Sequence, residues 1–226
     1  MAIYLLTSHK KGVSSHQLAR DIKVTQKTAW FMLQRLRLAL GNGSFEMIGG
    51  DKVVEIDESF VGGKNKNRHA NKKVKNSQGR ACIHKTPVLG MIERGGTLVA
   101  KVMKDTSSVQ IEPIVLETIK SNSAVMTDEW KAYKKLNKVY AHSFVKHGEG
   151  QYVVGNVHTN SIEGFWSQLK RSIFGIYHST SRVHLQKYVD ESVFRYNTRK
   201  VGEGERVALV IGLANCRLKY HELITK

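Results

Sequence analysis

The sequence predicts an α/β domain with a mixed sheet flanked by helices, preceded by a small helical segment. Short apolar runs typical of buried strands occur at 53–57, 87–93, 97–103, 124–127 and 140–145. Helical patterns are expected at 109–120, 161–174, 184–198 and 205–220. This order of elements places helices on the faces of one sheet: three strands, a helix, two further strands and then helices.

The helical segment at the front reads as two helices joined by a tight turn. Ser14 is a good N-cap for a short helix, and Thr25 can cap a longer basic helix over 26–40. This pattern is typical of helix-turn-helix DNA-binding motifs, although an ordinary helical hairpin has it too. The expected polar face of the longer helix consists of Gln26, Lys27, Trp30, Gln34, Arg35 and Arg37.

Composition narrows the class of protein. The net charge of +17 favours an anionic partner such as nucleic acid, although a merely basic protein has the same property. The two cysteines, Cys82 and Cys216, are too few and too far apart for a cysteine-based zinc site, so no zinc is expected. No apolar stretch reaches the length of a membrane span, so a cytoplasmic, nucleoid-associated protein without membrane contact is expected.

Three carboxylates are the candidate catalytic residues. Asp57 and Asp128 each end an apolar run, and Glu163 falls in a helical pattern. Carboxylate oxygens suit Mg²⁺ or Mn²⁺, and two such ions about 4 Å apart can drive phosphoryl transfer. Alternation places Glu55 on the same strand face as Asp57, and only the expected strand end favours Asp57. Each acid taken alone is also compatible with a turn or a solvated helix surface.

A basic segment follows Asp57. Between Gly62 and Lys85 there is no acidic residue. Its cations are Lys64, Lys66, Arg68, Lys72, Lys73, Lys75, Arg80 and Lys85. A solvated loop and a loop that grips phosphates are both compatible with this pattern, because a loop disordered alone can order on a polyanion.

Three motifs carry a family resemblance. They are Val-Glu-Ile-Asp-Glu-Ser-Phe-Val-Gly-Gly-Lys at 54–64, Thr-Asp-Glu-Trp-Lys-Ala-Tyr at 127–133 and His-Thr-Asn-Ser-Ile-Glu-Gly-Phe-Trp-Ser-Gln-Leu-Lys at 158–170. Together they resemble the ISXO-two-like transposase domain of bacterial insertion sequences, a group of DDE transposases with a ribonuclease-H-like fold. The resemblance covers about residues 50–200. The expected domains are therefore a helix-turn-helix segment over 1–45, a catalytic domain over 50–200 and a helical extension over 201–226.

The resemblance implies a function and further residues. Asp57, Asp128 and Glu163 would bind two Mg²⁺ or Mn²⁺ ions for cleavage and joining of double-stranded DNA at the element ends. Lys170, with Arg171 beside it, would contact DNA. His158 and Asn160 also match the family, with Asn160 equally suited to capping the helix. Pairing of two ends implies a homodimer on DNA.

The chain also departs from the family, and two other functions stay open. Many members carry a cysteine-rich zinc ribbon ahead of the helix-turn-helix, and this sequence has none, which leaves its recognition of DNA ends in question. A non-catalytic DNA-binding remnant or repressor would share the charge and the helices. A nuclease of the same fold would share the carboxylates.

Overall fold

The computed structural model describes residues 1–41, 46–63, 69–73, 75, 82–128, 131–145, 159–215 and 217–224. The chain divides into two compact units. One is Glu46–Ser167, and the other combines Met1–Phe45 with Gln168–Lys226. Within the described residues, no helix is both long enough and apolar enough to cross a membrane.

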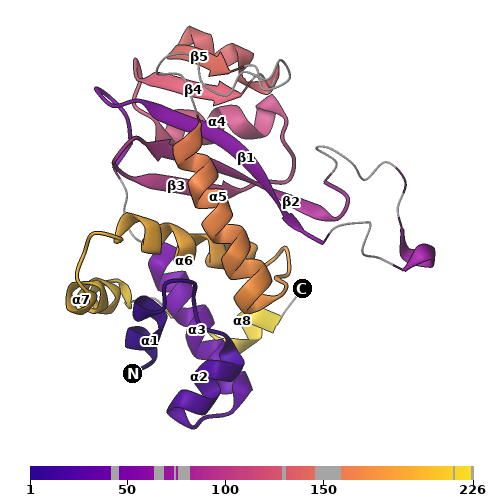
Figure 1. Cartoon of the computed structure of the whole chain (residues 1–226), viewed down its shortest axis with the longest axis vertical. Coiled ribbons are helices and arrows are strands. Elements are labelled where there is room, and N and C mark those ends of the chain that lie inside the picture. The colour runs from indigo at the N-terminus through magenta and orange to yellow at the C-terminus, as the bar shows by residue number, and fades with distance from the viewer. Residues whose placement is uncertain are drawn as a thin grey trace. The chain divides into compact units, whose positions relative to one another are not determined.

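The unit Glu46–Ser167 is built on a five-stranded mixed sheet (Figure 1). Its strands are β1 Val54–Gly62, β2 Lys85–Glu93, β3 Leu98–Val102, β4 Ala124–Asp128 and β5 Ala141–Val145. They are ordered β3-β2-β1-β4-β5, with β1, β2 and β3 antiparallel and with β4 and β5 parallel to β1. This order confirms the predicted mixed sheet and is the ribonuclease-H-like arrangement.

The first strand is longer than the sequence predicts. Its expected end was Asp57, but β1 pairs with β2 along its whole length, from Val54 opposite Glu93 to Gly62 opposite Lys85. Asp57 therefore lies in the middle of β1, opposite Gly90. The prediction that Asp57 is a strand-end residue is wrong, because the polar residues after it still find ladder partners on β2.

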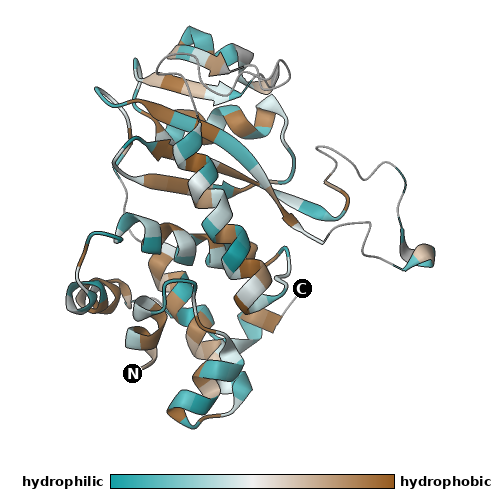
Figure 2. Ribbon diagram, in the orientation of Figure 1, coloured by the Kyte–Doolittle hydropathy of each residue, from teal (hydrophilic) through white to brown (hydrophobic). Residues whose placement is uncertain are grey.

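Helices cover both faces of this sheet. The helix α4 Ser108–Thr118 and the 3-10 helix η3 Lys131–Lys138 pack on one face, where they share a core with apolar residues of β1, β2 and β4. The strands β2 and β3 are largely apolar, as Figure 2 shows. On the other face lies the start of α5 Asn160–Ser172, whose Ile162 and Trp166 meet the backbone of Gly90.

The second unit is helical. Its helices are α1 Ala2–Ser8, α2 Ser15–Ile22, α3 Gln26–Gly41, α6 Leu185–Asn197, α7 Glu203–Leu213 and α8 Tyr220–Ile224. It also holds the end of α5 and the π-helix η5 Ile173–Tyr177 that continues it. The expected single helix over 205–220 is two helices, α7 and α8, since Gly212 and Asn215 near the break are poor helix formers.

The predicted short helix, turn and long helix are α2 and α3. Ser14 caps α2, its hydroxyl accepting a hydrogen bond from the Gln17 amide at 3.1 Å. Lys23 ends α2 in the left-handed conformation, with φ of 54°, and turns the chain into α3. Leu18 of α2 and Leu33 of α3 meet in the apolar core of this unit.

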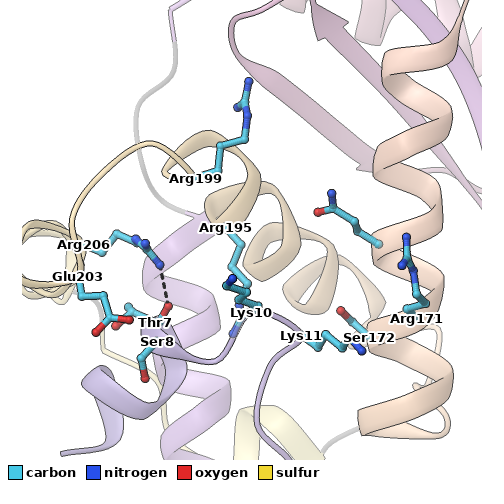
Figure 3. A pocket seen from close by; sticks show the side chains of 11 residues that line it. Thr7, Ser8, Lys10, Lys11, Arg171, Ser172, Arg195, Arg199, Glu203 and Arg206 are labelled. Atoms are coloured by element: carbon cyan, nitrogen blue, oxygen red, sulfur yellow. Dashed lines mark hydrogen bonds between the residues drawn. The ribbon is translucent and has the colours of Figure 1, made fainter.

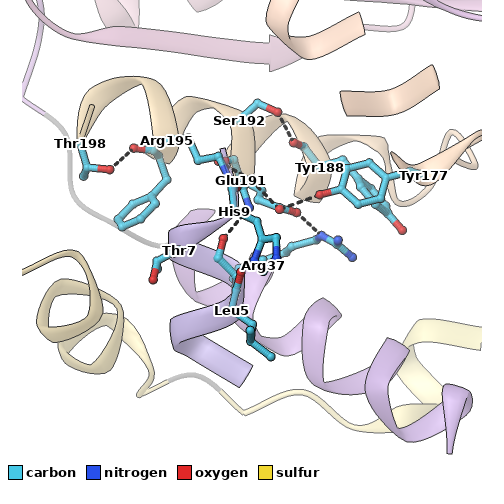
Figure 4. A network of polar contacts seen from close by, with 12 residues as sticks. Leu5, Thr7, His9, Arg37, Tyr177, Tyr188, Glu191, Ser192, Arg195 and Thr198 are labelled. Atoms are coloured by element: carbon cyan, nitrogen blue, oxygen red, sulfur yellow. Dashed lines mark hydrogen bonds and ion pairs between the residues drawn. The ribbon is translucent and has the colours of Figure 1, made fainter. Parts of the chain in front are cut away.

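A buried ion network joins α3 to α6 (Figure 4). The Arg37 guanidinium donates to Glu191 at 2.5 Å, and Arg195 pairs with the same carboxylate at 2.6 Å. Burial alone would raise the pKa of Glu191, but Arg195 and Arg37 outweigh it and lower that pKa to about 2. Arg37 is only 1% exposed and Gln34 is fully buried, so their expected place on an exposed polar face is wrong.

Candidate metal centre

Three carboxylates meet where β1 and β4 separate. The two strands pair only at Val54 with Val125 and at Glu55 with Met126. Beyond that point, ligand oxygens of Asp57, Glu58 and Asp128 all lie within 4.8 Å of one another. The structure therefore brings together two of the predicted acids, Asp57 from β1 and Asp128 from the neighbouring strand β4, and adds Glu58.

Asp57 is held by α5. The indole N–H of Trp166 donates to Asp57 Oδ2 at 3.0 Å, which holds this carboxylate oxygen toward α5. Burial, followed by the nearby charges of Glu58 and Asp128, raises the pKa of Asp57 to about 7. Trp166 is 4% exposed, and from the sequence it is more readily taken as an ordinary core residue.

Glu55 has a different role from Asp57 although both lie on the face of β1 that meets α5. Its carboxylate accepts hydrogen bonds from the amides of Ser161 at 2.9 Å and Ile162 at 3.1 Å. Arg94 donates to the same carboxylate at 2.7 Å. Fully buried and engaged in this way, Glu55 fixes the N-terminus of α5 on the sheet and caps a helix end, which carries partial positive charge.

Glu58 belongs to the cluster despite its position on the strand. Alternation directs it away from the α5 face, toward η3, where Tyr133 is 1% exposed. Burial, and then the charges of Glu58, Asp57 and Asp128, raise the pKa of Tyr133 well above its usual value. The phenol thus stays protonated beside the three carboxylates. Strand alternation in the sequence argues against Glu58, because it places this residue on the opposite face of the strand from Asp57, and yet the structure brings Glu58 into the cluster.

Glu163 is exposed in the first turn of α5 and is not one of the three clustered acids. Thr159 donates to its carboxylate at 3.4 Å. Glu163 precedes Trp166 by three residues, so the two side chains are neighbours on one side of the helix. Asn160 is exposed at the first residue of α5, where the following amides donate to Glu55.

The predicted DNA-contacting residues are spread over several elements. On α3, Gln26 donates to the Ser15 hydroxyl at 2.8 Å, Lys27 lies over the ring of Tyr220, and Arg35 is exposed. Lys170 and Arg171 are exposed near the end of α5, and Lys73 is exposed after the 3-10 helix η2 Ala70–Lys72. Lys64, Lys66, Arg68, the Lys72 side chain and His158 lie outside the described residues. All these contacts stay predictions.

The sequence of residues 47–197 matches the family model of the ISXO2-like transposase domain. The match includes the three clustered acids, Trp166 and Glu163. The chain belongs to the ISXO2-like transposase family. The resemblance inferred from the three motifs is thereby confirmed.

Two relatives of this ISXO2-like transposase carry related names. An uncharacterized protein in transposable element ISH50 of Halobacterium salinarum is 28% identical over 180 residues, which cover 76% of this chain and 60% of the relative. An uncharacterized transposase-like protein of Haemophilus influenzae is 25% identical over 101 residues, covering 44% of this chain and 80% of the relative. The chain thus spans little more than half the length of the first relative.

Among solved structures, similarity extends to the mariner Mos1 paired end complex with Mg, at 10% sequence identity and a TM-score of 0.33. It covers 96% of this chain and 79% of the Mos1 chain. A pre-cleavage Mos1 transpososome gives a TM-score of 0.27 at 8% identity, with the same coverage. Similarity at this level is too low to establish a fold, which here follows from the strand order and the family.

The donor set fits hard divalent cations. All three clustered groups are carboxylates, which suit Mg²⁺ or Mn²⁺ rather than softer metals. Burial, and then the charges of Glu58 and Asp128, raise the pKa of Asp57, and a bound cation would favour its ionised form. The carboxylates of Asp57, Glu58 and Asp128 therefore have the chemistry and the spacing to hold a divalent cation.

Proposed function

We propose that this ISXO2-like transposase cleaves double-stranded DNA at the ends of its element and joins the ends to a target, using Mg²⁺ or Mn²⁺. The observation that carries the proposal is the approach of Asp57 and Asp128 from the neighbouring strands β1 and β4, with Glu58 beside them. A protein that only binds DNA gains nothing from clustered acids, which repel phosphates.

The chain's own residues supply the frame for this chemistry. Two divalent ions held by such a site would activate the attacking oxygen and stabilise the leaving oxygen. Asp57 and Asp128 would hold the ions, with Glu58 and Glu163 as the candidates for the remaining carboxylate positions. Trp166 orients Asp57 through its indole N–H, and Glu55 anchors the start of the helix that carries Glu163.

Single substitutions test the assignment. We expect Asp57→Asn and Asp128→Asn each to lower strand transfer by at least about 100-fold, because each removes a central ligand. The assay uses a pre-cleaved element end, a target plasmid and Mg²⁺ or Mn²⁺. Comparing Glu58→Gln with Glu163→Gln shows which of the two supplies a further ligand.

Glu117→Gln is the matched control, since Glu117 is an exposed acid on α4 away from the cluster. It should keep full activity. Retained strand transfer in both aspartate variants would refute the proposal. Cleavage without joining by the unmodified protein would instead identify a nuclease, and DNA binding without either reaction would identify a non-catalytic binder.

A further inference from the structure

The helical unit contains a cavity of about 350 Å³ whose wall is strongly basic (Figure 3). It is bounded by the end of α1, the end of α5, α6 and the start of α7. Its cationic lining residues are Lys10, Lys11, Arg171, Arg195, Arg199 and Arg206. Among the described residues that line it, Glu203 is the one acid. We call this cavity the basic pocket.

Two of its arginines are fixed by backbone carbonyls at the end of α1. Arg195 donates to the carbonyls of Leu6 at 2.6 Å and His9 at 3.0 Å. Arg206 donates to the carbonyls of Thr7 at 3.1 Å and Val201 at 3.0 Å. These hydrogen bonds hold both guanidinium groups in place. Arg195 is also paired with Glu191, so of these two arginines it is Arg206 that adds positive charge to the wall.

Three further cations add to the positive charge of the wall. Within the described residues, Lys10, Lys11 and Arg199 form no ion pair. The nearby Glu191 is already shared between Arg37 and Arg195, so its charge is compensated. Like charges gathered in this way repel one another, and the repulsion is relieved when an anion enters.

The lining is also exposed and polar, as a site for a polyanion chain requires. Lys10, Lys11, Arg171 and Arg199 are exposed, so the pocket opens to solvent and a ligand need not be enclosed completely. Arg199 is braced over the ring of Tyr196 at 4.0 Å and donates to the Tyr196 carbonyl. Thr7, Ser8, Ser172 and Gln168 add polar groups among the cations.

We propose that the basic pocket binds backbone phosphates of DNA, at a site separate from the exposed face of α3. This inference rests on the proposed action of the chain on DNA, and it adds where part of the backbone is held. Contacts of this kind position a duplex without reading its sequence.

The test measures binding of a fluorescently labelled duplex of random sequence by anisotropy between 50 and 300 mM KCl, without divalent metal. We expect Lys10→Gln with Lys11→Gln to weaken binding about tenfold at 100 mM KCl and to lower the salt slope by about two, since each lysine accounts for about one phosphate contact. Glu203→Gln should strengthen binding, because it removes the pocket's acid.

The matched control is Arg217→Gln with Lys219→Gln, which removes two exposed charges from the same unit outside the pocket. Circular dichroism confirms that each variant is folded. An unchanged affinity in the Lys10 and Lys11 variant, or an equal loss in the control, would overturn the proposal.

Two further readouts separate this proposal from others. If the Lys10 and Lys11 variant binds DNA normally while the unmodified protein completes strand transfer, the pocket assignment fails and the proposed function stands. If the unmodified protein binds DNA through the pocket but transfers no strand, the pocket assignment stands and the proposed function fails. If inorganic phosphate raises the melting temperature only with both lysines present, and DNA binding does not depend on them, the ligand is a free anion and the proposal fails.

Discussion

Asp57 is a partly buried carboxyl group whose pKa is raised to about 7, first by burial and then by Glu58 and Asp128. In the folded protein it keeps its proton up to about pH 7, whereas the unfolded chain releases that proton near pH 4. The folded state therefore loses stability from this group as pH rises from about 4 to about 7, when no metal is bound. The ionised Asp57 carboxylate, which is suited to binding a cation, therefore destabilises the folded protein when no cation is bound.

Replacing this carboxyl should stabilise the metal-free protein. We expect Asp57→Asn to raise the free energy of unfolding by about 2 kcal/mol at pH 8, and by little at pH 4, because only the ionised carboxylate is penalised. Urea unfolding in EDTA at both pH values measures this. Mn²⁺ should stabilise the unmodified protein and not the variant. Parallel pH profiles for the two proteins would contradict the prediction, and Glu117→Gln controls for loss of an exposed acid.

The residues of this site differ in how far the sequence predicts them. Asp128 does end its strand, as its apolar run indicates. The sequence favours Asp57 over Glu55 only through a strand end that Asp57 does not occupy. In the structure the two acids differ in their partners, since Asp57 accepts from Trp166 and Glu55 accepts from the start of α5. Glu58 and Trp166 required the tertiary structure, since neither alternation nor helical periodicity shows which side chains meet across the sheet.

At the scale of elements, the contact between β2 and α5 depends on a glycine. A Cβ atom at Gly90 would lie 2.7 Å from both Ile162 Cδ1 and Trp166 Cζ2. We expect Gly90→Ala to displace α5 and to lower the free energy of unfolding by about 1–3 kcal/mol, the usual cost of overpacking. Displacing Trp166 also removes its hydrogen bond to Asp57, so Mn²⁺ binding should weaken.

Gly164→Ala is the matched comparison within α5. A Cβ atom there would meet nothing within 4 Å beyond its chain neighbours and the backbone of α5 itself, and alanine is the better helix former. The free energy of unfolding should therefore rise by about 0.5–1 kcal/mol. Urea unfolding of both variants measures whether each substitution raises or lowers the free energy of unfolding. Equal effects from the two substitutions would contradict the proposed packing of α5 on Gly90.

The link between α3 and α6 rests on Glu191, which is 1% exposed between Arg37 and Arg195. We expect Glu191→Gln to lower the free energy of unfolding by about 3–5 kcal/mol, because it leaves a buried guanidinium without its counter-charge. Replacing both Arg37 and Glu191 by methionine should cost less than this single change. A larger loss in the double variant would contradict the prediction.

Glu191 also makes the free energy of unfolding depend on pH, but in the opposite direction from Asp57, because its stabilising contribution is lost in acid. Its folded pKa of about 2 lies below that of the unfolded chain, which is near 4.5. Its stabilisation is therefore complete above about pH 4.5 and is lost as pH falls from about 4.5 toward 2. Thermal unfolding followed by circular dichroism from pH 7 to pH 3 should show this loss, which Glu191→Gln should reduce.

Helical periodicity predicts α2 and α3 well but not which polar residues of α3 are buried. It places Arg37 and Gln34 on a polar face with Lys27, and no local pattern shows that Arg37 and Gln34 are buried. Their partners Glu191 and Tyr188 are each 154 residues away in the chain. A buried ion pair of this kind is fixed by tertiary structure, so a single sequence does not reveal it.

At the scale of the whole molecule, the net charge of +17 dominates the interaction with a polyanion. The three predicted catalytic acids oppose that charge. Replacing Asp57, Asp128 and Glu163 by their amides together raises the net charge by three. DNA affinity without metal should therefore stay the same or increase, while strand transfer is lost.

The measurement is duplex binding by anisotropy as a function of KCl, with EDTA present. For both the unmodified protein and the triple variant, the logarithm of affinity should fall linearly with the logarithm of salt concentration, at a slope of about 0.9 per phosphate neutralised. A triple variant that binds at least as tightly as the unmodified protein separates binding from chemistry in one chain. Weaker binding by the folded triple variant at all salt concentrations would show instead that these carboxylates support the DNA-binding surface, and the division between a basic binding surface and an acidic catalytic centre would be wrong.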